Sequence, residues 1–226
     1  MNGRELSMFE ENAVYNSRII DRIWLSENTF ELKIERPDYF KFTSGQRVTF
    51  IIDQYQRDYS IVSSPENSDL RFCIRNIKSG RMSTYLSSCA VKTTLHFKGP
   101  HGYFTFKPSV RPPIFVATGT GIAPFCSMAH SGIRGFALLH GVRSPTELYY
   151  KTYLDTTAEK YIPCIEATAQ SRFKYFKGRV TKYLQEYFSS GTYDFYLCGK
   201  REMIKDVILI VDDLFPGSYI YTEIYY

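Results

Sequence analysis

The chain has 226 residues, of which 44% are hydrophobic, and a formal net charge of +5. This composition suits one large or two small packed domains and argues against disorder. No apolar run reaches the roughly 18 residues of a membrane helix, and the first residues lack the apolar core of a signal peptide, so we expect a cytoplasmic protein. The positive balance favours an acidic partner or a phosphate-bearing ligand. Because it is not concentrated in one basic run, we expect no nucleic-acid partner.

The cysteine and histidine positions argue against a metal centre. The five cysteines stand at positions 73, 89, 126, 164 and 198, and their spacing matches neither a zinc motif nor an iron–sulfur motif. An odd number of widely separated cysteines indicates reduced thiols. The four histidines are dispersed too, and we interpret them as ordinary surface or core residues. We therefore expect no metal site.

The first half of the chain consists of short runs rich in β-branched and aromatic residues. Phe30-Glu-Leu-Lys-Ile34 alternates apolar and polar residues, as a half-buried strand does, and one helical segment at Met82–Ser88 interrupts the runs. This pattern predicts an antiparallel β-barrel domain over residues 1–108. The expected strands are Val14–Leu25, Thr29–Glu35, Arg47–Ile52, Asp58–Ser63, Leu70–Asn76 and Thr94–Lys98.

The second half has a different pattern, which begins after the proline-rich linker Lys107–Pro113. Strand-like and helical segments alternate, which predicts an α/β, Rossmann-like domain with a parallel sheet covered on both faces over residues 109–226. The clearest helix, Lys200–Leu214, carries apolar residues at helical spacing. The expected strands are Ile114–Ala117, Phe136–His140, Ile162–Ala167, Asp194–Leu197 and Tyr219–Glu223.

The segment from Phe115 to Phe125 joins an apolar run to a glycine-rich turn and a helix start. Gly119 and Gly121 flank Thr120, and Pro124 suits the first turn of a helix. Such a turn can bring free backbone N–H groups and a positive helix end to a dinucleotide pyrophosphate. A Gly-x-Gly sequence is also common in ordinary turns.

Two segments of the barrel half carry groups suited to a phosphate and a flat ring. In Arg57-Asp-Tyr-Ser60, the arginine can clamp a phosphate and the tyrosine can stack on a heterocycle. The alternative is a surface arginine beside a core tyrosine. In Gly80-Arg-Met-Ser-Thr-Tyr-Leu86, a helix start offers N–H groups and the Ser83 hydroxyl to an anion. The alternative there is an ordinary capped helix.

Taken together and in this order, the motifs resemble those of the ferredoxin–NADP⁺ reductase family, over nearly the whole chain. The matching segments are Arg57-Asp-Tyr-Ser60, Gly80-Arg-Met-Ser83, Gly99-Pro-His-Gly-Tyr-Phe104, Gly119-Thr-Gly-Ile-Ala-Pro124, Cys198-Gly199 with Met203, and the ending Thr222-Glu-Ile-Tyr-Tyr226.

The resemblance implies that FAD binds to the barrel. Arg57 would hold a flavin phosphate, Tyr59 would stack on the flavin ring and Ser60 would lie near its N5 atom. The flavin pyrophosphate would contact Gly80, Arg81, Met82 and Ser83.

The resemblance also implies that NADPH binds to the second domain, at Thr120 and Gly121. Cys198 would abut the nicotinamide, and Glu223 would assist proton movement. The chain has one residue after the family's Glu-x-Tyr ending, as in its bacterial branch, so Tyr225 would face the flavin and Tyr226 would lie further out, near the adenine. The catalytic residues expected on this basis are Ser60, Cys198, Glu223 and Tyr225.

The preference between NADPH and NADH depends on contacts to the 2′-phosphate. Arg143, Ser171 with Arg172, and Arg179 follow predicted strands or open the next helix, which places them on the carboxyl side of the sheet, where ligands bind. This arrangement is similar to the 2′-phosphate site of the bacterial family members and favours NADPH. The alternative is that these arginines are solvated surface residues.

The function implied is an NADPH-dependent flavoprotein reductase that exchanges single electrons with ferredoxin or flavodoxin, an acidic carrier that suits the positive charge. We expect a monomer. The nearest alternative is a flavin reductase or the reductase component of an oxygenase, which shares both domains. An alternative of another class is a non-enzymatic regulatory subunit that binds FAD.

Overall fold

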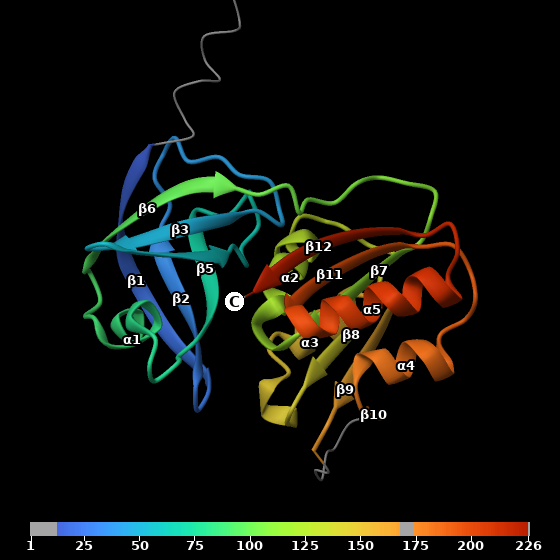
Figure 1. The fold of residues 1–226 in the computed structure, drawn as a ribbon. Helices are drawn as coiled ribbons and strands as arrows, with labels where there is room; N and C mark the ends of the chain where they lie inside the picture. Colours follow the sequence, from blue (N-terminus) through green and yellow to red (C-terminus); the bar gives the residue numbers. More distant parts are fainter. Residues whose placement is uncertain (1–12, 168–173, 226) are drawn as a thin grey trace, which may run out of the picture. The chain divides into compact units, whose positions relative to one another are not determined.

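The computed structural model describes residues 13–167 and 174–225 (Figure 1). The chain divides into two compact units, Met1–Thr105 and Phe106–Tyr226. The first contains an antiparallel sheet and the second a parallel sheet. Each unit is described separately.

The first unit is a six-stranded antiparallel barrel with one helix, α1 (Arg81–Ser88). The strand order is β4-β3-β6-β1-β2-β5. The two ends of this order meet through the bridge between Ile61 and Phe72 and the hydrogen bond from the Val62 N–H to the Arg71 carbonyl, 2.7 Å. The strands are β1 (Val14–Ser26), β2 (Thr29–Glu35), β3 (Arg47–Ile52), β4 (Tyr55–Ser60), β5 (Asp69–Arg75) and β6 (Thr94–His101).

Strand β4 differs from the predicted strand Asp58–Ser63, which was wrong at both ends. It starts at Tyr55 because Ile52 pairs with Tyr55 across a two-residue turn, in which Asp53 has a φ of 52°. Aspartate tolerates this left-handed conformation, but Asp53-Gln54 lacks the glycine that usually marks such a hairpin. The ladder with β3 ends at the pair Arg47–Ser60.

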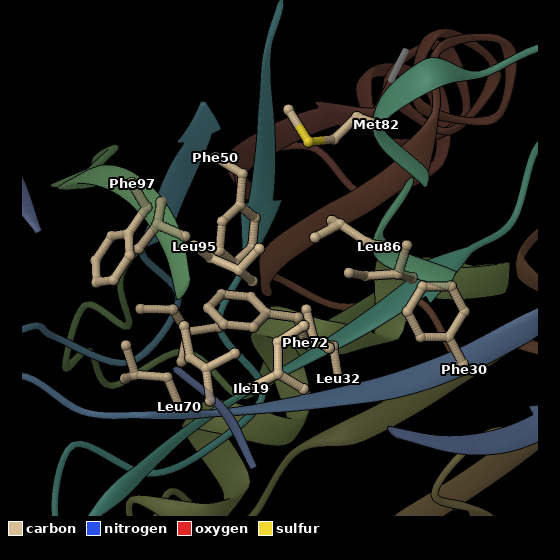
Figure 2. Packing of buried hydrophobic residues seen from close by; sticks show 14 of the residues in the cluster. Ile19, Phe30, Leu32, Phe50, Leu70, Phe72, Met82, Leu86, Leu95 and Phe97 are labelled. Atoms are coloured by element: carbon tan, nitrogen blue, oxygen red, sulfur yellow. The ribbon is translucent and has the colours of Figure 1, made fainter. Parts of the chain in front are cut away.

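Alternation along the strands builds the barrel core. In β2, Phe30, Leu32 and Ile34 are fully buried, whereas the residues between them are partly exposed. The aromatic rings meet edge to face: the Phe50 and Phe72 ring centroids are 5.0 Å apart at 71°. Figure 2 shows this cluster, with Met82 and Leu86 extending into it from α1. Helix α1 is therefore anchored by side chains one turn apart.

The second unit is an all-parallel sheet with the strand order β10-β9-β8-β7-β11-β12. Its strands are β7 (Pro113–Thr118), β8 (Ala137–Val142), β9 (Lys160–Ile165), β10 (Phe176–Lys177), β11 (Asp194–Lys200) and β12 (Tyr219–Tyr225). Its helices are η1 (Gly119–Ile122), α2 (Ala123–His130), η2 (Pro145–Glu147), α3 (Lys151–Thr157), α4 (Val180–Tyr187) and α5 (Arg201–Leu214). The short strand β10 was not predicted, because two residues carry no periodicity.

Helices cover both faces of this sheet, as the strand–helix alternation predicted. Helices α4 and α5 lie on one face (Figure 1), where Val116 and Leu197 of the sheet pack with their residues. On the other, Phe115 stacks on Phe125 of α2, with ring centroids 4.7 Å apart. Since successive strand residues point to opposite faces, Phe115 and Val116 fix the two layers.

Candidate functional site

The side chains of β4 and the start of α1 form the first group of candidate residues. Among the described residues, the exposed Arg57 guanidinium donates only locally, from Nη1 to the Gln56 carbonyl at 3.0 Å. Arg81, the first residue of α1, lies over the Tyr55 ring, with Cζ 4.5 Å from the ring centroid, and hydrogen-bonds the Tyr55 hydroxyl. Two cationic side chains therefore belong to neighbouring elements, β4 and α1, and both can bind an anion.

Tyr59 and Ser60 end the same strand in a less polar environment. Burial raises the pKa of the Tyr59 phenol to about 12, an effect that the nearby Arg57 charge partly opposes. Ser60 is 3% exposed, and its hydroxyl oxygen has no hydrogen-bond partner within the described protein. Buried polar atoms are normally hydrogen-bonded, so this oxygen suits a polar ligand atom at the end of β4.

The segment before α1 is held by its own hydroxyl. The Ser83 Oγ accepts a hydrogen bond from the Ile77 N–H at 3.1 Å, and Ser83 is 5% exposed. A Cβ on Gly80 would lie 2.8 Å from that oxygen, which explains the glycine. The Met82 side chain packs into the core, so Met82 could contact a ligand only through its backbone. The first N–H groups of α1 have no acceptor within the helix and suit a phosphate.

The glycine turn of the second unit packs against the end of β11. A Cβ on Gly121 would lie 2.7 Å from the Cys198 carbonyl carbon and 2.8 Å from the Gly199 Cα. The Thr118 hydroxyl accepts a hydrogen bond from the Lys200 N–H at 3.0 Å. In contrast, a Cβ on Gly119, which has a φ of 53°, would meet nothing within 4 Å. The turn is thus held at Gly121 by the end of β11 and is open at Gly119, where a ligand can approach its backbone.

Cys198, Glu223 and Tyr225 lie together beside this turn. Strands β11 and β12 are parallel and in register, with Cys198 opposite Glu223 and Lys200 opposite Tyr225. Burial, and then the neighbouring Glu223 carboxylate, raise the pKa of the Cys198 thiol well above its ordinary value, and the nearby Tyr225 side chain opposes this rise. The thiol is therefore neutral at physiological pH and is no activated nucleophile.

Charged side chains gather where β8 and β9 end. Arg143 directly follows β8, and Glu166 directly follows β9; the Glu166 N–H donates to the Val142 carbonyl at 3.1 Å. Arg179, the N-cap of α4, pairs with Glu166, with Nε 3.2 Å from Oε1. Both partners are largely exposed, at 70% and 52% of the side-chain surface. The predicted residues Ser171, Arg172 and Tyr226 lie outside the described residues.

Sequence patterns did not single out Tyr55, Thr118 or Glu166. Tyr55 stands two residues before Arg57 and thus on the same strand face, a signal that was lost because the start of β4 was misplaced. Glu166 directly follows β9 at the carboxyl edge, where ligands bind, but a lone glutamate there has no distinctive pattern.

Two other kinds of feature are absent from residues 13–167 and 174–225. No group of three or more histidine, cysteine or acidic residues is arranged to hold a metal ion. No helix in the same ranges combines the length and apolar character needed to cross a membrane.

Comparisons with known proteins define the class of the chain. Residues 17–106 match the oxidoreductase FAD-binding domain, and residues 115–208 match the oxidoreductase NAD-binding domain. The barrel is thus an FAD-binding domain and the parallel-sheet unit an NAD-binding domain. A protein with both is a flavin-dependent oxidoreductase.

Relatives and solved structures narrow the class. The chain is 30% identical to the toluate 1,2-dioxygenase electron transfer component of Pseudomonas putida, over 94% of this chain and 68% of the relative. It is 35% identical to ferredoxin–NADP reductase B of Sorangium cellulosum (strain So ce56), over 64% of each protein. A ferredoxin NADP⁺ reductase from Neisseria gonorrhoeae, solved with bound FAD and NADP, shares the fold with a TM-score of 0.82 at 22% identity, over 93% of this chain and 98% of that one. The chain belongs to the ferredoxin–NADP⁺ reductase family, and it spans only 60% to 68% of the first four curated relatives.

Proposed function

We propose that the protein oxidises NADPH through a bound FAD and exchanges single electrons with a separate acidic carrier, ferredoxin or flavodoxin. The observation that carries this proposal is the buried, neutral Cys198 thiol, which has Glu223 and Tyr225 beside it and belongs to a residue whose backbone packs against the glycine turn. A neutral thiol can pack against a nicotinamide ring without introducing a charge. Placement of two reacting rings is the main contribution that a protein makes to hydride transfer.

The barrel residues that suit FAD divide into two groups. Arg57, Arg81 and the first N–H groups of α1 are suited to its phosphates. Tyr59 offers a partly buried ring for stacking, and Ser60 offers the buried hydroxyl that lacks a partner among the described residues. When bound, the flavin supplies the ability to accept a hydride and to pass electrons on singly.

In the second domain the chain's own residues would bind and orient the nucleotide. The turn at Thr120 and Gly121 suits the pyrophosphate, and Arg143 and Arg179 suit a 2′-phosphate. The Glu223 carboxylate can hold or move a proton beside the Cys198 thiol.

The Glu166–Arg179 pair bears on nucleotide preference. Glu166→Gln removes a carboxylate that competes with a 2′-phosphate for Arg179. We expect the kcat/KM ratio of NADPH to NADH to rise about two- to fivefold, since an exposed ion pair is worth about 0–1 kcal/mol. The rise should shrink at high ionic strength, because salt screens exposed charges.

Glu186→Gln is the matched control for this substitution. It removes a carboxylate from the Lys182–Glu186 pair on α4, and the ratio should stay unchanged. A shift toward NADH in Glu166→Gln would mean that this carboxylate does not oppose a phosphate at Arg179.

Tyr225 bears on nucleotide affinity, because its side chain lies beside the thiol against which we propose that the nicotinamide packs. We propose that the nicotinamide must displace the Tyr225 ring from the flavin. A chain that ends at Ile224 should therefore bind NADP⁺ about two- to tenfold more tightly, since displacing a stacked ring costs about 0.5–1.5 kcal/mol. Labelling of Cys198 by a thiol reagent, followed by mass spectrometry, should accelerate as well. A chain that ends at Tyr225 is the control. Unchanged affinity and labelling in the shorter chain would exclude a covering role.

The function is tested by the absorbance spectrum of purified protein before and after anaerobic addition of NADPH. A flavin spectrum that bleaches, followed by reduction of added ferredoxin or flavodoxin, is the expected result. Protein that is colourless and inert toward NADPH and ferricyanide would instead favour the regulatory subunit.

A second candidate is the reductase component of an oxygenase. It is favoured by the similarity to several dioxygenase electron transfer components, including that of toluate 1,2-dioxygenase. This candidate predicts electron delivery to an oxygenase-linked carrier. Comparing the rates at which the reduced protein reduces such a carrier and ferredoxin or flavodoxin separates the two candidates.

A further inference from the structure

A buried histidine connects the core of the NAD-binding domain to its glycine turn. His140, on β8, has no exposed surface. Its Nε2 lies 3.1 Å from the Gly119 carbonyl oxygen, and its Nδ1 lies 3.1 Å from the Tyr161 hydroxyl. The three groups come from the adjacent strands β9 and β8 and from the turn that follows β7, so the chain of hydrogen bonds runs across the sheet.

The acceptors and donors fix the tautomer of this ring. The Gly119 carbonyl can only accept, so Nε2 must carry the proton and donate. Burial lowers the pKa of His140 to about 4, partly offset by the bond to Gly119, so the ring is neutral near pH 7 and Nδ1 is an acceptor. The Tyr161 hydroxyl then donates to Nδ1, and burial, which raises the pKa of Tyr161, keeps its proton in place. Each of the three groups has a defined donor or acceptor role.

The bond between His140 and the Gly119 carbonyl also determines where the Thr120 N–H of the same peptide points. In a planar trans peptide, the Gly119 carbonyl and the Thr120 N–H point in opposite directions. With the carbonyl held against buried His140, the Thr120 N–H points away from it. Thr120 lies in the first turn of η1, where N–H groups have no acceptor within the helix, and the position of a Cβ on Gly119 is open.

We propose that His140 and Tyr161 are positioning residues for nucleotide binding: the hydrogen-bonded chain from Tyr161 through His140 to Gly119 holds the peptide that presents the Thr120 N–H to the nucleotide pyrophosphate. The inference rests on the proposed function, because it takes the nucleotide to lie at this turn. His140 touches neither ring of the reaction and acts through the backbone of Gly119.

The test is calorimetric titration of the flavin-loaded protein with ADP-ribose, which contains the pyrophosphate, and with AMP, which does not. In His140→Met the affinity for ADP-ribose should fall about five- to tenfold and that for AMP should stay within about twofold. In His140→Gln, which keeps an N–H donor, the ADP-ribose loss should be under about threefold. In Tyr161→Phe, which leaves the buried Nδ1 atom without its donor, the ADP-ribose loss should be about two- to fourfold. KM for the nucleotide should rise while kcat changes little.

The matched controls change a histidine–tyrosine pair at the other end of α2. The His130 and Tyr153 rings are 4.3 Å apart, and His130→Met and Tyr153→Phe should leave ADP-ribose binding unchanged. Nitrogen-15 NMR of the wild-type imidazole should show a protonated Nε2 and a bare Nδ1. Because the tautomer and Tyr161→Phe are read out independently, the inference stays testable if His140→Met does not fold.

The outcomes separate this inference from the proposed function. If Gly119→Ala weakens ADP-ribose binding while His140→Met and Tyr161→Phe do not, or if Nδ1 carries the proton, the positioning role is wrong and the nucleotide site stands. If the wild-type protein does not bind ADP-ribose, both fall.

Discussion

Replacing Gly121 with alanine should reduce nucleotide affinity on the order of a hundredfold or more, while flavin content stays unchanged. The added Cβ would lie 2.7 Å from the Cys198 carbonyl carbon and 2.8 Å from the Gly199 Cα, and both are backbone atoms that cannot rotate away. The turn must therefore shift from the position in which it receives a ligand. Overpacking of this kind costs about 1–3 kcal/mol of stability as well.

Two other glycines separate the causes of this loss. Gly132→Ala, at the end of α2, adds a methyl group that meets nothing within 4 Å at a φ of 91°, and it should lower stability without affecting nucleotide binding. Gly119→Ala adds a methyl group that meets no protein atom within 4 Å, at a φ of 53°, so a loss of affinity there would come from contact with the ligand or from backbone strain and not from a clash with β11. NADP⁺ titration and thermal unfolding of the three variants measure the two effects. Wild-type affinity in Gly121→Ala would show that the nucleotide does not use this turn.

Replacing Arg57 with alanine should weaken FAD retention by about tenfold to a hundredfold. Its guanidinium is exposed and, within residues 13–167 and 174–225, donates only to the Gln56 carbonyl beside it, so its removal costs the described fold little. A charge-assisted hydrogen bond to a phosphate is worth about 1.5–3 kcal/mol, which converts to this loss. The measurement is flavin content after gel filtration, together with the FAD dissociation constant.

Arg18→Ala is the matched control for Arg57, because Arg18 is also an exposed arginine on a strand of the barrel. It should retain flavin as the wild type does. Equal retention in Arg57→Ala and Arg18→Ala would remove Arg57 from the flavin site.

The elements with strong periodicity could be predicted from the sequence, and contacts between distant segments could not. Strands β2 and β3 have the predicted bounds, and helix α5 differs by one residue at its start, because alternation and helical spacing are local properties. The two domain classes followed from the change of pattern between the halves of the chain, and the family followed from ordered motifs. The packing of Gly121 against Cys198 depends on two turns far apart in the chain, so the motif suggested a site without revealing what fixes it.

The roles of His140 and Glu166 were not predicted for the same reason, because they depend on contacts between distant segments. His140 looked like an ordinary core residue, since its role depends on two partners on other elements, Gly119 and Tyr161. Glu166 became visible only when the fold brought the end of β9 to the N-cap of α4. Conversely, the Ser83 hydroxyl, which the sequence suggested for an anion, is already engaged by the Ile77 N–H, and this bond fixes the loop before α1.

The closure of the barrel has a thermodynamic consequence for the cofactor. Strand β4 pairs continuously with β3 but is joined to the β5 side through the Ile61–Phe72 bridge and the Val62–Arg71 hydrogen bond. Local opening follows the most weakly joined segments, so backbone amides near this join should exchange with solvent earlier than those of β2. A flavin held by Arg57, Tyr59 and Ser60 binds to the strand beside the join, and a ligand that binds only the closed state shifts the equilibrium toward it. Substitutions that weaken FAD binding should then also increase the fraction of the barrel that is locally open at this join.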